Sequence, residues 1–327
     1  MTSNNVLSRR ILTLGFGSAM LAGAAAAQQA YPSKPIRLIV PYTTGAITDL
    51  LARLVGSEMT KAWGQQVVVD NRPGGNTVIG TDALVKSPAD GYTLLLVTAS
   101  HVILDPQASL PYDPIGNFAP VATIASNEFL MVLHPSVPAN TLPEFIALAK
   151  AQPGKLNYAS AGGGSASHLA GALFNTLAGV DIQHVPYKGG APALFDLLGG
   201  HVQMSYQSPI AVLNYVKEGK LKAIGFGNDT RLPALPDVPT FAEAGVPDYQ
   251  LKIWFGILAP AGTPEPIVDK LSAEIGRIVG MPAIRETLSS QGADPFINDP
   301  AQFTGLIATD KARFDALIKK ANIKFGN

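Results

Sequence analysis

Short runs of β-branched and aliphatic residues alternate with helical patterns from residue 36 onward, and this alternation constrains the fold more than any other feature. Ile36–Val40 has the composition of a strand, whereas Asp49–Trp63 places its apolar residues at helical spacing. A strand at 66–69, a helix at 77–85 and a strand at 92–97 follow. This β-α-β-α-β order predicts an α/β fold in which helices cover the faces of a parallel sheet.

The same alternation starts again after Pro135 and continues to about residue 225. Here the sequence predicts helices at 142–151, 167–177, 191–198 and 210–217 and strands at 155–159, 181–185, 201–206 and 221–225. The rest of the chain is expected to form a strand at 251–259 and helices at 265–279, 282–291 and 300–320. These last helices have no sheet of their own, so they should pack on the first domain.

At about 150 residues per domain, a chain of 327 residues suits two domains. We expect lobe 1 to comprise residues 28–128 and 253–327, and lobe 2 residues 129–252. The chain would cross between them near 125–132 and 249–254. Two lobes, each with a mixed, mostly parallel sheet, would then enclose a cleft whose width can change.

The N-terminus has the order of an export signal. Arg9 and Arg10 are the only charges before Lys34, an apolar run covers Ile11–Ala27, and small residues precede a cut before Gln28. Residues 1–27 are therefore expected to be a cleaved signal peptide, with a retained anchor as the alternative. The paired arginines fit both the twin-arginine and the general secretory route. The product should be soluble in the periplasm and not membrane-anchored.

Charge and composition exclude several function classes. The chain has 24 basic and 24 acidic residues, and removing two arginines with the signal leaves 22 against 24, a formal charge of −2. This balance gives no support to nucleic-acid binding, which needs a basic face. The absence of cysteine excludes disulfides and thiolate chemistry. The five histidines show no metal-ligand spacing, so we expect no metal site.

The first candidate site is the segment between the first strand and the first helix. Ligands of open α/β sheets bind at the carboxyl ends of strands, and free amides at a helix start favour an anion. The candidate ligand-binding residues here are Tyr42, Thr43, Thr44, Gly45, Ala46, Thr48 and Asp49. The alternative is a structural turn in which Thr48 or Asp49 caps the helix.

The second candidate is a glycine-rich segment between the strand at Tyr158 and the helix at Leu169. Its candidate residues are Ser160, Ala161, Gly162, Gly163, Gly164, Ser165 and His168. Glycines let backbone N–H groups approach an anion closely. The segment lacks the glycine spacing of a dinucleotide site, the lysine of a Walker loop and the pattern of a nucleophile elbow. A flexible turn, with His168 as a cap, is the alternative.

Ser100 and His101 follow the third strand, where a ligand contact or a structural role is equally expected.

Several motifs then fall in one order along the chain. They are 71–76 (Asn-Arg-Pro-Gly-Gly-Asn), 87–92 (Ser-Pro-Ala-Asp-Gly-Tyr), 110–114, 153–158, 184–189 (His-Val-Pro-Tyr-Lys-Gly), 234–240, 243–245 and 258–264. In this order and spacing the chain closely resembles the Bug-type solute receptors, the extracytoplasmic components of tripartite tricarboxylate transporters.

The resemblance implies a two-lobed "Venus flytrap", no enzyme activity and no cofactor. It implies ligand carboxylates held by amides, hydroxyls and water at the two segments above. Asn76 is a further candidate ligand-binding residue. The resemblance also implies that the ligand is handed over to a small and a large membrane subunit. We expect the receptor to be a monomer. Competing interpretations are a ligand sensor for a signalling partner and a periplasmic hydrolase using Ser165 and His168.

Two departures from the family pattern bear on the ligand. Gly45-Ala46 stands where relatives usually have paired glycines, and Tyr206-Gln207 stands where they often have Asp-Asn. Without that carboxylate a cationic amino-acid group would be buried unpaired, so the ligand is expected to be an amine-free dicarboxylate or aromatic carboxylate. Tyr206 could stack on an aromatic ring opposite Tyr42, or it could simply fill the core.

Overall fold

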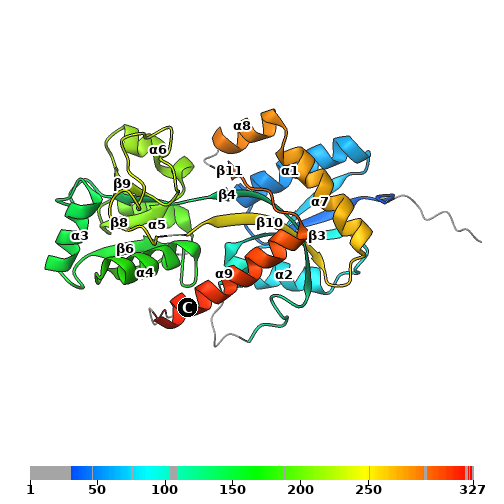
Figure 1. Cartoon of the computed structure of the whole chain (residues 1–327), viewed down its shortest axis with the longest axis horizontal. Helices are drawn as coiled ribbons and strands as arrows, with labels where there is room; N and C mark the ends of the chain where they lie inside the picture. The colour runs from blue at the N-terminus through cyan, green and yellow to red at the C-terminus, as the bar shows by residue number, and fades with distance from the viewer. Residues whose placement is uncertain are drawn as a thin grey trace, which may run out of the picture.

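The computed structural model describes residues 31–45, 47–74, 77–103, 109–187, 189–249, 251–290, 293–320, 323 and 325. The expected signal peptide, Ala46 and Asn76 lie outside these residues. Within them the chain forms two sheets, one in each of two side-by-side bodies, lobe 1 and lobe 2 (Figure 1).

Lobe 1 contains a six-stranded sheet of order β11-β4-β10-β3-β1-β2. Its strands are β1 (Ile36–Val40), β2 (Val67–Asn71), β3 (Thr93–Thr98), β4 (Phe118–Asn127), β10 (Ile253–Pro260) and β11 (Asp294–Pro295). Its helices are α1 (Ile47–Trp63), α2 (Val78–Val85), α7 (Glu265–Val279), α8 (Pro282–Ser290) and α9 (Pro300–Lys320), with a 3-10 turn η1 (Ala99–Val102). The three C-terminal helices pack on this lobe, as the sequence predicts; α7 and α9 both contact β4.

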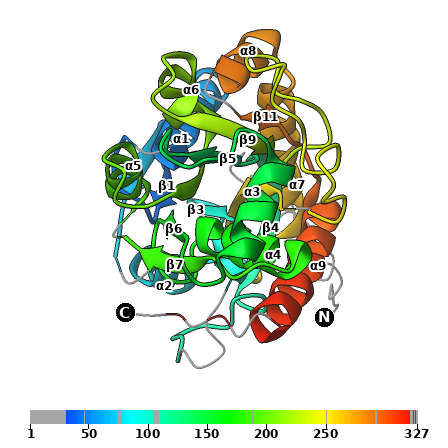
Figure 2. The ribbon, with the colours of Figure 1, turned by 90° about the vertical axis from the view of Figure 1, so that its left-hand side faces the viewer.

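Lobe 2 contains a five-stranded sheet of order β7-β6-β8-β5-β9. Its strands are β5 (Leu130–Leu133), β6 (Asn157–Ser160), β7 (Gln183–Pro186), β8 (Met204–Gln207) and β9 (Lys222–Phe226). Its helices are α3 (Leu142–Ala151), α4 (Ala166–Ala178), α5 (Gly190–Leu198) and α6 (Pro209–Lys217). Figure 2 looks onto this lobe from its outer end.

Both sheets are mixed, and this confirms the predicted fold class. In lobe 1 the first three strands pair in parallel, whereas β10 pairs antiparallel with both β3 and β4. In lobe 2 the pairs β6–β7 and β6–β8 are parallel, and β5 is antiparallel to both neighbours. Most described strands of each sheet still run in one direction. The exceptions are β10 and β11 in lobe 1 and β5 in lobe 2.

Apolar periodicity explains why these elements pack where they do. In α7 the buried residues Val268, Leu271, Ile275 and Ile278 recur every three or four positions, so one face of the helix covers the sheet. All residues of β10 are buried, as expected for a strand at the centre of a covered sheet. Trp254 in this strand is fully buried and its indole N–H donates to the Asp310 carboxylate at 2.8 Å.

The chain passes from the first sheet to the second between β4 and β5, and it returns at β10 (Figure 1). Thr98, the last residue of β3, pairs with Phe255 near the start of β10. Gln207, the last residue of β8, pairs with Leu130 at the start of β5. The carboxyl ends of the parallel strands of both sheets therefore face the region between the lobes.

A buried carboxylate lies where the chain passes between the sheets. Glu128 follows β4, is 2% exposed, and has Oε1 3.9 Å from Nζ of Lys252, the residue before β10. Burial, opposed by Lys252 and reinforced by Asp294 and Asp229, raises the pKa of Glu128 to about 7. Nearby, the Asn228 amide donates to Asp294 at 3.3 Å and so joins lobe 2 to β11.

Candidate functional site

The loop after β1 is the lobe 1 part of the candidate site. Thr43, Thr44 and Gly45 are exposed, and Gly45 has φ +86°, a conformation that glycine adopts without strain. The Tyr42 hydroxyl lies 2.9 Å from Oγ1 of Thr98 at the end of β3, and burial raises the pKa of Tyr42 to about 12. This contact ties the end of β3 to the residue two positions after β1.

Asp49 stabilises this loop through its side-chain carboxylate. Its side chain is 4% exposed, accepts the Gly45 N–H at 3.0 Å, and pairs with Arg53 one turn along α1. The hydrogen bonds from Arg53, Gly45 and Asn71 outweigh desolvation and lower the pKa of Asp49. Asp49 thus lies within the first turn of α1, where it holds the Gly45 backbone and pairs with Arg53.

Asn71 shares this role, and sequence reasoning missed it. Its side-chain amide donates to the Tyr42 carbonyl at 3.2 Å, and its oxygen accepts from Arg53 at 3.2 Å. The sequence signal that could have identified Asn71 is its position as a polar residue at the end of a predicted strand. Thr48 is buried at the start of α1, and among the described residues its hydroxyl has no hydrogen-bond partner. This hydroxyl is therefore available as a side-chain donor at the loop.

Removing the Asp49 carboxylate should weaken ligand binding. We expect Asp49→Ala to reduce affinity for the ligand about tenfold, roughly 1.4 kcal/mol, because Gly45 loses a charge-assisted hydrogen bond and the loop is no longer held. The control is Asp315→Ala, which removes an exposed i,i+4 pair with Lys311 on α9. Isothermal titration calorimetry should show wild-type affinity for the control. Equal affinities for both variants would show that Asp49 does not stabilise the binding loop.

His101 is a structural residue. It is 6% exposed, its Nε2 lies 2.8 Å from the Pro114 carbonyl oxygen, and its ring packs edge-on against Phe118 at 4.8 Å. Burial lowers the pKa of His101 to about 4, so the ring is neutral at neutral pH. Of the two roles expected for this position, the structure therefore supports the structural one. Ser100 is half-buried, and its N–H donates to Thr98 Oγ1 at 3.2 Å.

The loop between β6 and α4 is the lobe 2 part of the site. Four of its amides point inward: Ala161 N–H donates to Ser167 Oγ, Gly162 N–H to Ser160 Oγ, Gly164 N–H to His168 Nδ1 and Ser165 N–H to the Gly162 carbonyl. Within the described residues the amides of Gly163, Ala166 and Ser167 have no such partner. Of the three candidate glycines, Gly162 and Gly164 therefore use their amides within the loop itself.

The side chains of the loop mostly hold its shape. Ser165 is the N-cap of α4; its Oγ accepts from His168 N–H at 3.3 Å and donates to the Gly162 carbonyl at 2.7 Å. Ser160 is buried, and its Oγ contacts both Gly162 and a ring nitrogen of His184 on β7. Among the described residues, the unpartnered amides of the loop are those of Ala166 and Ser167 in the first turn of α4 and of Gly163 just before the helix. They lie at the positive end of the helix dipole, which suits the loop to a carboxylate.

The C-terminal segment from lobe 1 reaches this loop. Helix α9 contacts α4, and the two lie side by side in Figures 1 and 2. Beyond the helix, Phe325 packs against Gly164, which has φ +74°. A side chain at position 164 would overlap the Phe325 ring. The chain end is a feature of the loop that sequence patterns did not indicate.

Tyr206 lies in the core. Its side chain is 1% exposed, faces Tyr249 with ring centroids 6.3 Å apart, and meets Tyr158 edge-on. Burial and the neighbouring tyrosines raise the pKa of Tyr206 well above its usual range. Strand alternation sends Gln207 to the other face, where its amide donates to Ser205 Oγ at 2.9 Å. The core-filling alternative for Tyr206 is the one that the structure supports.

The Ser165–His168 geometry does not form a nucleophile and base. The contact between them runs from the His168 backbone N–H to Ser165 Oγ, and the Nδ1 of His168 already accepts the Gly164 N–H at 3.1 Å. A base must accept the nucleophile's proton, and this ring nitrogen is aimed elsewhere. Among the described residues no group of three His, Cys, Asp or Glu side chains could hold a metal ion.

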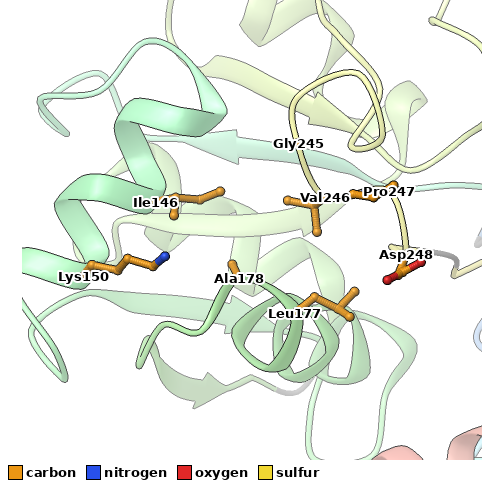
Figure 3. A pocket seen from close by; sticks show the side chains of 8 residues that line it. All are labelled: Ile146, Lys150, Leu177, Ala178, Gly245, Val246, Pro247 and Asp248. Atoms are coloured by element: carbon orange, nitrogen blue, oxygen red, sulfur yellow. The ribbon is translucent and has the colours of Figure 1, made fainter.

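A separate pocket of about 240 Å³ lies on lobe 2, between α3, α4 and the turn at 245–248 (Figure 3). Ile146, Leu177 and Val246 form its apolar part, with Lys150 and Asp248 among its lining residues. It contains none of the residues that sequence analysis selected. Its volume is below the range of about 300–1,000 Å³ for ligand pockets, so it is a weaker candidate than the loops between the lobes.

Known proteins share this architecture. Protein BugT from Bordetella pertussis is 37% identical over 297 residues, covering 90% of this chain and 91% of BugT. The structure of R. palustris Rpa4515 with adipate is 34% identical, with TM-score 0.81, covering 90% of this chain and 99% of that chain. MatC from Rhodopseudomonas palustris with bound malate is 32% identical, with TM-score 0.75, covering 88% and 100%.

Two α/β lobes, two crossing strands and facing loops define a two-lobed solute-binding protein. The model of the tripartite tricarboxylate transporter family receptor matches residues 51–323, and the chain belongs to this family. The family consists of extracytoplasmic solute-binding receptors, and the resemblance drawn from the sequence motifs is confirmed. No helix in the described part of the chain is long and apolar enough to cross a membrane.

Proposed function

We propose that this protein is a non-enzymatic receptor that captures a small, amine-free dicarboxylate between its two lobes. One carboxylate would accept hydrogen bonds from the amides of Gly163, Ala166 and Ser167. The other would accept hydrogen bonds from the hydroxyls and amides of the loop 42–48. The observation that carries the proposal is the N-terminus of α4, where the amides of Gly163, Ala166 and Ser167 have no hydrogen-bond partner among the described residues.

Charge and packing support an amine-free ligand. The Gln207 side chain is neutral and engaged with Ser205, so it offers no counter-charge to an ammonium group. Adipate and malate, which the similar structures hold, are both dicarboxylates without an amine. Because the Tyr206 ring is buried in the core, it is not available to stack on an aromatic ligand. We therefore favour an aliphatic chain.

The family supports a role in transport. We infer that residues 1–27 direct export, that the mature protein acts in the periplasm as a monomer, and that it delivers its ligand to the membrane subunits of a tripartite transporter. Hinge bending between β4 and β5 and before β10 would let the lobes close on the ligand and open for delivery.

Calorimetric titration tests the proposal. Adipate, malate and succinate should include at least one ligand that binds saturably, whereas aspartate and glutamate should bind at least tenfold more weakly, about 1.4 kcal/mol. NMR spectra of the mixtures after a day should show unchanged ligand, because a receptor does not turn it over. Tight binding of aspartate or glutamate alone would contradict the amine-free assignment, and a converted ligand would contradict the receptor function.

A further inference from the structure

Two histidines stack beneath the lobe 2 loop. His168 comes from the first turn of α4 and His184 from β7, and their ring centroids are 3.7 Å apart with an interplanar angle of 6°. Tyr158 on β6 packs against His184 at 5.1 Å, and its hydroxyl donates to the His168 carbonyl at 3.2 Å. The pair is therefore fixed by three elements of lobe 2.

Each ring has one hydrogen bond to the loop. His168 Nδ1 accepts the Gly164 N–H at 3.1 Å, which requires the imidazole proton to lie on Nε2. His184 Nε2 lies 2.5 Å from Ser160 Oγ, and that hydroxyl in turn contacts the backbone N–H and carbonyl of Gly162, each at 3.1 Å. The two rings thus fix the peptide groups on both sides of Gly163.

We propose that the stacked His168–His184 pair is a positioning device that holds the Gly162 and Gly164 amides inward and thereby aims the Gly163 amide at the ligand carboxylate. The inference rests on the proposed function, because it deals with the same loop. Neither ring touches the ligand: His168 is buried behind Gly164, and His184 acts through Ser160.

The electrostatics of the pair agree with this role. Burial lowers the pKa of both histidines to about 4, and the neighbouring His168 lowers that of His184 further. Both rings are therefore neutral at neutral pH. A protonated His168 would turn a donor toward the Gly164 N–H, and two cations would repel each other across the stack.

The decisive measurement is hydrogen exchange of the Gly164 amide by NMR in the ligand-free protein. His168→Leu should speed this exchange at least tenfold, because the acceptor is gone, whereas His168→Asn should restore slow exchange, since Asn Oδ1 can replace Nδ1 as acceptor. His134→Leu, a substitution of a half-buried histidine in lobe 2 that bonds Ser136 and not this loop, should leave the exchange unchanged. Unchanged Gly164 exchange in folded His168→Leu would overturn the proposal whether or not any dicarboxylate binds.

Ligand affinity gives the second readout, with adipate as the probe. His168→Leu and His184→Leu should each weaken adipate binding at least tenfold, and His168→Asn and His184→Gln should recover most of the loss. If the wild type binds adipate and both leucine variants bind it equally well, the positioning role is wrong although the receptor function stands. If the wild type binds none of the dicarboxylates, the receptor proposal fails while the exchange result still decides the role of the pair.

Discussion

Replacing Gly164 by alanine is expected to weaken dicarboxylate binding at least tenfold, about 1.4 kcal/mol, while the protein remains folded. Gly164 has φ +74°, and an added Cβ would overlap the ring of Phe325. Both effects push the peptide away from its bond to His168 and so disturb the neighbouring Gly163 amide. Titration calorimetry on the purified variant measures the change.

Gly179→Ala is the matched control. Gly179 ends the same helix, α4, in the left-handed conformation with φ +62°, and nothing lies within 4 Å of an added Cβ. Alanine there carries a similar backbone strain, of about 1 kcal/mol, without touching the loop. It should lower the melting temperature by a few degrees and leave affinity unchanged. If both variants lose affinity alike, the loss reflects general strain and the special role of Gly164 is wrong.

The second large effect is expected from Glu128→Gln, which should stabilise the protein above pH 7 and flatten its pH dependence. The folded-state pKa of Glu128 is raised from 4.5 to about 7, mainly by burial, so folding favours the protonated form. Its contribution to the free energy of unfolding is therefore fully present below about pH 4.5 and is lost as the pH rises through about 7. The difference corresponds to up to about 3 kcal/mol.

Calorimetric melting of wild type and variant from pH 5 to pH 8 measures this effect. The gain of the variant over the wild type should be largest at pH 8 and shrink toward pH 5. Lys252 is 45% exposed, so water solvates its ammonium group when the carboxylate is replaced. Glu286→Gln, at an exposed site on α8, should follow the wild-type curve. A constant offset between Glu128→Gln and wild type at all pH values would refute the buried-carboxylate explanation.

Sequence periodicity predicted most of the helices and the parallel strands, because each of these buries one face or one run of aliphatic residues. It missed β4, whose sequence from Phe118 to Asn127 contains a proline and several small or polar residues. That strand is stabilised by its antiparallel pairing with β10, more than a hundred residues further along the chain. A local pattern carries no information about such a partner.

The sequence predicted two candidate loops, since strand-to-helix turns at one sheet edge are where ligands bind. The roles of individual side chains could not be predicted from it. Asp49 and His168 have the chemistry of ligand contacts, but each is turned toward its own loop. The partner of Ser160, His184, comes from a neighbouring strand and shows no spacing that would mark it. All four residues of β8 are buried, so both faces of the strand are covered. The alternation of side chains therefore did not show which face Tyr206 occupies.

A crystal structure of the protein with a bound dicarboxylate from the calorimetric panel tests the central claim most directly. We predict one carboxylate within hydrogen-bond distance of the amides of Gly163, Ala166 and Ser167, and the other at the loop 42–48, with the ligand enclosed between the lobes. A ligand seated in the pocket formed by α3, α4 and the turn at 245–248, with both loops empty, would contradict the account.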